Sequence, residues 1–277
     1  MKPPIPIARI PFARTLAAVL CVWLLISCAQ TTSVGVSNVS RSQMMIVSSE
    51  SVNSEAERLY AAVLEEARSK HALNRSQRDY DRVVRITRRL IEQAPFFRED
   101  CRNWKWEINV ISSDELNAWC MPGGKIAVYS AMVSALELSD DELAVVIGHE
   151  MAHALREHSR EQASQQVLQN SALSITSLFG FGGIASYLGS TVAKYGITLP
   201  FSREHETEAD EIGLELVAMA GYDTDAGPRV WEKMNAADGT QPAEILSTHP
   251  SNESRIADLT RLSWLLKQKY HSNDDSI

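Results

Sequence analysis

The sequence predicts a mostly helical α+β domain with a small antiparallel β-sheet beside a central helix. Two observations favour this fold class. Apolar residues recur at the spacing of amphipathic helices over most of the chain after residue 54, with charged residues between them. Runs around residues 104–110 and 125–129 instead alternate between apolar and polar residues, which is the period of half-buried strands. We therefore expect several helices packed around a few short strands.

The first 27 residues have the pattern of a secretory signal. A basic start precedes an apolar run from Leu16 to Ile26, which is too short to cross a bilayer comfortably. The run ends on Leu25-Ile26-Ser27-Cys28, which resembles the lipobox of bacterial lipoproteins and implies cleavage before Cys28 and a lipid on its sulfur. An ordinary secreted protein is the alternative. Ala29 stands where an inner-membrane retention signal has aspartate, so the periplasmic face of the outer membrane is the expected location.

Charge and composition divide the remaining chain. Removal of residues 1–27 takes away three basic residues and leaves 24 Lys and Arg against 35 Asp and Glu, a net charge of −11. This balance argues against a nucleic-acid partner. Residues 28–53 are rich in serine and are predicted to form a lipidated, flexible tether. Residues 54–271 are predicted to form one folded domain, with 272–277 as a tail.

Two amphipathic helices are expected first in this domain, over Ser54–Ser69 and Arg78–Gln93. The second carries four arginines that could form a basic binding patch. On an acidic chain we interpret them as a solvated face: Arg82, Arg85, Arg88 and Arg89.

The expected strands decide the state of two cysteines. The first strand turns at residues 112–115 into a second extended run from Asn117. A hairpin there would place Cys120 about 25 Å from Cys101 at the usual rise per residue, and a disulfide needs Cα atoms within about 7 Å. We therefore expect free, buried thiols. The following Pro122-Gly123-Gly124 leads into a third strand, and it either accepts an extended peptide alongside or forms a plain tight turn.

The central helix has a well-marked start and a motif with metal-ligand spacing. Ser139 is a good N-cap, with Glu142 as its capping-box partner. The helix then carries His149-Glu150-Met151-Ala152-His153. Histidines four residues apart share one helix face and can reach one metal ion, while Glu150 can address a water there. His158 lies off this line and is expected to be solvated. The motif alone also arises by chance.

Residues 172–193 are apolar but interrupted by glycines and hydroxyl residues. We expect a glycine-hinged helical pair that can act as a lid over the site. A membrane span is the alternative.

A later helix supplies a third candidate ligand. Its apolar stripe ends at Gly221, and extended backwards the stripe passes through Glu206. A carboxylate on a core face is costly unless it binds a metal or a cation. Asp210, one turn on, can reach a ligating histidine and orient it. The alternative is an acidic surface helix slightly out of phase. The remaining carboxylates are expected to be solvated: Glu204, Glu208, Glu211 and Glu215.

Together, the HExxH motif at 149–153 and the ExxxD motif at 206–210 resemble those of the M48 metallopeptidases. The resemblance implies a zincin (gluzincin-like) domain that binds one Zn²⁺ per chain. It implies His149, His153 and Glu206 as zinc ligands, Glu150 as general base and Asp210 as the group that orients a ligand. His249, in a Thr-His-Pro loop, resembles a position that approaches the metal and stabilises the oxyanion; the alternative is a loop histidine without a catalytic part.

The expected function is a zinc-dependent endopeptidase of the bacterial envelope that acts on unfolded, misfolded or misassembled proteins. The substrate would lie extended along residues 123–129, and the lipid would hold the protein at the membrane. The alternative is a lipoprotein that holds unfolded chains or an assembly partner without hydrolysis. A last helix from Ser254 to about residue 271 is expected to pack on the core. The sequence sets no oligomeric state.

Overall fold

The computed structural model describes residues 28–171, 201–237, 245, 249 and 253–270. Its main sheet has three strands, β3 (Glu107–Ile111), β4 (Ala118–Met121) and β5 (Lys125–Tyr129), in the order β3-β5-β4. β5 runs parallel to β3 and antiparallel to β4. The sheet is therefore mixed, and both the wholly antiparallel sheet and the hairpin between the first two strands were wrong predictions.

The glycine pair explains the observed strand order. Gly123 and Gly124 both have φ of 80°, a left-handed conformation that glycine adopts without strain. They form the tight turn that folds β5 back along β4, as the plain-turn alternative requires. Because β5 then lies between its two neighbours, residues 125–129 cannot accept an added strand. In the described part of the chain, the side of β4 away from β5 pairs with no strand.

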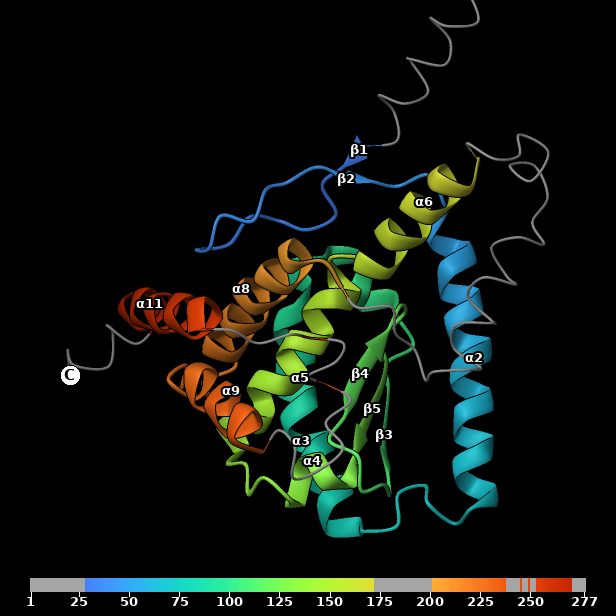
Figure 1. Cartoon of the computed structure of the whole chain (residues 1–277), viewed down its shortest axis with the longest axis vertical. Helices are drawn as coiled ribbons and strands as arrows, with labels where there is room; N and C mark the ends of the chain where they lie inside the picture. Colours follow the sequence, from blue (N-terminus) through green and yellow to red (C-terminus); the bar gives the residue numbers. More distant parts are fainter. Residues whose placement is uncertain (1–27, 172–200, 238–244, 246–248, 250–252, 271–277) are drawn as a thin grey trace, which may run out of the picture.

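The sheet lies between two apolar clusters, and Figure 1 shows helices on both of its sides. Side chains of β4 alternate between its faces: Trp119 packs with the helix α2 (Ser49–Ser69), whereas Ala118 and Cys120 belong to the larger core. That core is built on the helices α3 (Gln77–Gln93) and α5 (Asp140–Leu155). The short helix α4 (Ser130–Ser134) connects β5 to the segment before α5. The chain also forms two 3₁₀ turns, Ala94–Phe96 and Glu99–Asn103.

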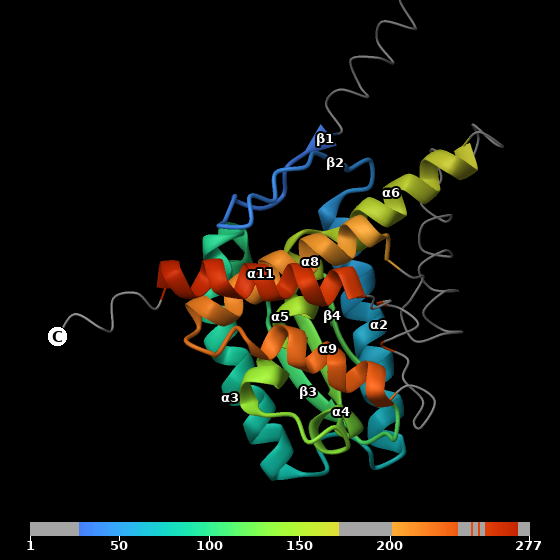
Figure 2. The same cartoon turned by 60° about the vertical axis from the view of Figure 1, so that its left-hand side comes forward.

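Three helices lie on the other side of α5: α8 (Arg203–Met219), α9 (Ala226–Ala237) and α11 (Glu253–Tyr270). Figure 2 shows α11 crossing in front of α8, with α9 beside it. α5 and α8 touch backbone to backbone, because a Cβ at Gly213 would lie 2.8 Å from the His149 nitrogen. This close approach brings the histidine and carboxylate motifs of the two helices together.

The start of α5 confirms the predicted capping box. Ser139 accepts a hydrogen bond from the Glu142 nitrogen, and the Glu142 carboxylate accepts one from the Ser139 nitrogen. The end of α5 was not foreseen. The helix stops at Leu155, Glu157 adopts a left-handed φ of 55°, and a separate helix α6 (His158–Ser171) begins in a new direction.

The prediction of a flexible tether was wrong for residues 29–47, which belong to the folded domain. The backbone at Cys28–Ala29 (β1) pairs with Gln43–Met44 (β2), and Val39 and Met45 are buried. The Val36 nitrogen donates to the Glu215 carboxylate at 2.7 Å. The domain thus includes the segment 29–47, because its scattered apolar residues reach the core and its polar groups pair with buried carboxylates. α2 also starts earlier than expected, with Ser48 as N-cap.

Other predictions concern single groups. Cys101 and Cys120 are free and buried, as expected, although the hairpin argument for them was wrong. The arginines of α3 are not all solvated: Arg82 hydrogen-bonds Asp140 at 2.7 Å, and Arg89 hydrogen-bonds the Ala220 carbonyl at 2.5 Å.

Among the described residues, no helix is both long and apolar enough to cross a membrane. The signal over 1–27 and the glycine-hinged pair over 172–193 lie outside the described residues.

Candidate metal centre

Two imidazoles of α5 meet on its buried face. His149 and His153 are one turn apart, and their Nε2 atoms lie 3.1 Å from each other. Phe201, just before α8, stacks on the His153 ring with centroids 4.1 Å apart. This stacking shields one side of the pair from water.

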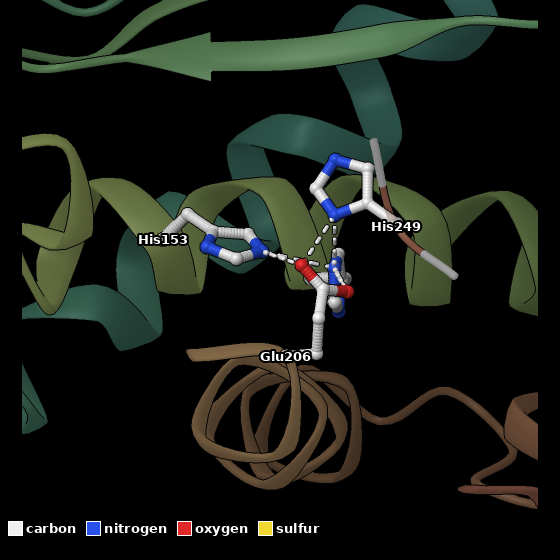
Figure 3. A group of neighbouring side chains, drawn as sticks. His153, Glu206 and His249 are labelled. Atoms are coloured by element: carbon white, nitrogen blue, oxygen red, sulfur yellow. Dashed lines mark hydrogen bonds and ion pairs between the residues drawn. The ribbon is translucent and has the colours of Figure 1, made fainter. Parts of the chain in front are cut away.

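A carboxylate and a third imidazole complete the group (Figure 3). Glu206 projects from the first turn of α8, and its Oε1 lies 3.4 Å from His153 Nε2. His249 points its Nδ1 toward the same place, 2.8 Å from Glu206 Oε1 and 3.2 Å from His149 Nε2. One donor atom from each of these four buried residues lies within 4.8 Å of the others.

The chemistry of this donor set fits a zinc ion. The other ring nitrogen of each α5 histidine has its own partner, Asp210 for His149 and His158 for His153. If those nitrogens carry the protons, two Nε2 lone pairs face each other at 3.1 Å, an arrangement that needs a cation between them. Imidazole nitrogens with a carboxylate oxygen are donors that Zn²⁺ prefers. The four residues can therefore hold one metal ion.

Asp210 and Arg255 support two members of this donor set. Asp210 Oδ1 lies 3.0 Å from His149 Nδ1, and Arg255 grips the same carboxylate through Nε at 2.5 Å and Nη2 at 2.8 Å. Arg255 Nη1 also lies 3.1 Å from Glu206 Oε2. Its guanidinium rests on the Trp231 ring, 3.6 Å from the centroid. The role of Arg255 was not predictable from the sequence, since a basic residue at the start of an amphipathic helix carries no signal of burial.

Glu150 lies beside the donor set. Its side chain is buried, and its Oε1 has no hydrogen-bond partner among the described residues. The Nε2 of His249 is 3.5 Å from that oxygen. Burial raises the pKa of Glu150 to about 7, so the carboxyl can both take up and release a proton near neutral pH.

His158 and Glu208 contradict their predicted exposure. Both are buried, and His158 contacts His153 through Nδ1 at 2.8 Å and Glu208 through Nε2 at 3.0 Å. Burial lowers the pKa of His158 to about 4, so its ring is neutral. The projection failed for His158 because α5 breaks at Glu157, where no glycine or proline signals a break. It failed for Glu208 because Arg41 and Arg156, from other segments, hydrogen-bond its carboxylate. Of the other carboxylates expected in solvent, Glu215 is also buried, while Glu204 is exposed.

Glu211, behind the site on α8, makes a pH-dependent contribution to stability. Burial raises its pKa to about 7, with Glu208 and Asp210 adding to the effect and Arg261 opposing it. Because the folded-state pKa is raised, Glu211 costs nothing below its unfolded pKa; its cost grows between that pKa and about 7 and stays constant at higher pH. We expect Glu211→Gln to stabilise the fold by about 1–2 kcal/mol at pH 8.5, after discounting partial exposure, and by less at pH 5.5.

Urea unfolding in excess zinc at both pH values measures this difference. The matched control is Glu204→Gln, on the same helix with an exposed side chain. An equal gain in the free energy of unfolding for Glu211→Gln at both pH values would show that the pKa of Glu211 is not raised in the folded protein.

The comparison with family models decides the relationship of this chain to known proteins. The model of peptidase family M48 matches residues 77–263, which is more than half of the chain and spans every residue of the donor set. The chain belongs to peptidase family M48. The resemblance in the two motifs is thereby confirmed.

Relatives within family M48 come from mitochondria and bacteria. The chain is 38% identical over 178 residues to the mitochondrial metalloendopeptidase OMA1 of Schizosaccharomyces pombe, which covers 63% of this chain and 50% of that protein. It is 35% identical over 175 residues to the OMA1 protein of Arabidopsis thaliana, covering 63% and 35%. It is 31% identical over 161 residues to the beta-barrel assembly-enhancing protease of Escherichia coli K12, covering 54% and 32%. The chain thus spans between about a third and a half of the length of these relatives.

Proposed function

We propose that this M48 protein is a zinc-dependent endopeptidase of the bacterial envelope that hydrolyses misfolded or misassembled proteins. The observation that carries the proposal is Glu150, a buried carboxylate beside four converging metal donors, whose Oε1 accepts no hydrogen bond from the residues that the structure describes. Burying such a group costs free energy, so a structural role explains it poorly. A general base needs a free oxygen next to the reacting atoms.

The residues divide the chemistry between them. Bound zinc would supply a Lewis acid that polarises the scissile carbonyl and lowers the pKa of water. Glu150 accepts the proton of the attacking water on Oε1 and then delivers it to the leaving amine. Asp210 accepts the Nδ1 proton of His149 and so keeps that ring oriented. His249 Nε2 lies 3.5 Å from Glu150 Oε1, so we expect His249 to stabilise the oxyanion from beside the general base.

The substrate is expected along β4 and not along residues 123–129. β5 is enclosed by its two neighbours, whereas β4 lies against α5 and has an open pairing side among the described residues. An extended peptide that added to β4 would pass beside the helix that carries Glu150. An unfolded chain adopts an extended conformation readily, whereas most segments of a folded protein are already paired or packed. This favours unfolded or misassembled substrates.

Activity on one protein in two states tests the proposed substrate class. We expect the zinc-loaded protein to cleave an outer-membrane β-barrel protein kept unfolded in urea-diluted buffer, and to spare the same protein folded in detergent. Equal cleavage of both states would contradict the preference for misfolded proteins. Binding without cleavage would favour the alternative, a chaperone-like protein that holds unfolded chains at the same site. The E. coli relative, named a beta-barrel assembly-enhancing protease, motivates this choice of substrate.

The location is proposed from the residues around Cys28. Cleavage before Cys28 and lipid attachment to its sulfur would hold the domain at the periplasmic face of the outer membrane. We expect Cys28→Ala to move the protein from the membrane fraction to the soluble fraction of the cell, with its specific activity unchanged. A Cys28→Ala protein that stays with the outer membrane would show that the lipid is not the anchor.

A further inference from the structure

The two α5 histidines of the donor set are held in different ways. His149 Nδ1 meets a carboxylate directly, since Asp210 Oδ1 lies 3.0 Å away. His153 Nδ1 meets a second imidazole instead, His158 Nδ1 at 2.8 Å. The far nitrogen of that second ring, Nε2, lies 3.0 Å from Glu208 Oε2. His153 therefore also leads to a carboxylate, but one ring further away.

The proton positions in the series His153, His158 and Glu208 follow from the hydrogen bonds of Glu208. Glu208 can only accept, because both of its oxygens already accept hydrogen bonds from the guanidinium groups of Arg41 and Arg156. His158 must then donate through Nε2, and a neutral ring that donates through Nε2 accepts through Nδ1. His153 consequently donates through Nδ1 and keeps its lone pair on Nε2, the atom that faces the donor set.

Arginines on both sides keep Glu208 in place. Arg156, at the C-cap of α5, approaches it through Nε at 3.2 Å and is fully buried. Arg41 hydrogen-bonds it through Nε at 2.9 Å and Nη2 at 3.0 Å. Arg41 also binds Glu161 of α6 through two nitrogens, at 2.5 Å and 2.8 Å. Arg41 belongs to the segment 29–47. Through Glu208, two hydrogen bonds therefore link this segment to His158, the ring that orients His153.

We propose that His158 and Glu208 form a positioning relay that sets the tautomer and orientation of His153, and that Arg41 ties this relay to the N-terminal segment. The relay gives His153 what Asp210 gives His149: an acceptor for Nδ1–H that leaves Nε2 free for the metal. It makes zinc affinity depend on the docking of residues 29–47. The proposal concerns metal binding and holds whether or not the protein turns over peptides.

Zinc affinity of three variants tests the relay. Competition with a fluorescent zinc chelator gives the dissociation constant without any substrate. We expect His158→Ala to weaken zinc binding by about 10- to 100-fold, the usual effect of losing a group that orients a ligating histidine. His158→Gln should recover part of the loss, because an amide can accept from His153 through oxygen and donate to Glu208 through nitrogen. Arg41→Ala should weaken zinc binding by a smaller factor.

One further measurement and one control variant complete the test. In Co²⁺-loaded protein, the visible absorption bands should shift in His158→Ala and return toward wild type in His158→Gln, which a general loss of stability would not produce. Glu204→Gln is the control, since Glu204 lies on the same helix as Glu208, is exposed, and is 3.5 Å from Arg41. Unchanged zinc affinity and an unchanged cobalt spectrum in His158→Ala would overturn the relay. If His158→Ala does not fold, the same result in Glu208→Gln would overturn it. A wild-type protein that binds no zinc would overturn both the relay and the proposed function, whereas unchanged variants beside a zinc-binding wild type would overturn the relay alone.

Discussion

Glu150→Gln is expected to lower kcat for an unfolded substrate by about a thousandfold or more, while zinc binding and folding are retained. General-base catalysis contributes about 10²- to 10⁴-fold, and an amide cannot accept the proton that a carboxylate accepts. The substitution preserves the size of the side chain, and Glu150 Oε1 has no described hydrogen bond to lose. Removing a buried carboxylate with a raised pKa should also leave stability unchanged or slightly higher.

Single-turnover rates on an unfolded protein, with zinc content measured on the same sample, check this result. Glu204→Gln is a suitable control, because it makes the same chemical change at an exposed position. Cleavage by Glu150→Gln at the wild-type rate would exclude the peptidase mechanism. Loss of both zinc and activity would mean that the variant has changed the donor set and not the base.

Glu206→Ala is expected to have the largest effect on metal binding, a loss of about a thousandfold or more in zinc affinity. Its carboxylate is the anionic member of the donor set and lies within 3.4 Å of both α5 histidines. Losing a direct donor should cost more than the 10- to 100-fold typical of groups behind the ligands. The change also removes the carboxylate oxygen that lies 3.1 Å from Arg255 Nη1, so a buried guanidinium loses one of its anionic neighbours.

Thermal unfolding with and without excess zinc separates these two consequences. We expect the zinc-dependent rise in Tm to disappear in Glu206→Ala, since a ligand stabilises only the state that binds it. Glu206→Gln keeps an oxygen donor without the charge, so its zinc-dependent rise in Tm should fall between those of the wild type and Glu206→Ala. A Glu206→Ala protein with wild-type zinc affinity would show that the assignment of this ligand is wrong.

Local features of the site were predictable because each depends on neighbours along one helix. The capping box at Ser139 and Glu142 fixes where α5 starts, and hence the phase that places His149 and His153 on one face. The phase of the apolar stripe on α8 likewise carried Glu206 inward, where the structure finds it buried beside both histidines. Helical periodicity is a short-range property, so it survives in the folded protein.

Pairings between distant segments were not predictable in the same way. The strand order depends on which strand the glycine turn places between the others, and the two alternatives have the same alternating pattern. The segment 29–47 has the composition of a tether, yet Arg41 binds carboxylates on α6 and α8. Composition describes a segment by itself, whereas docking depends on charges that other segments bury.

The sequence by itself determined the two motif helices, their inward-facing histidines and carboxylate, and the membership of family M48 that these motifs indicated. Only the tertiary structure decided that His249 joins the donor set, that Arg255 bridges Glu206 and Asp210, and that His158 turns back onto His153. The physical reason is the break at Glu157 and the close contact of α5 with α8. Both place side chains by contacts across the core, which no spacing along the chain records.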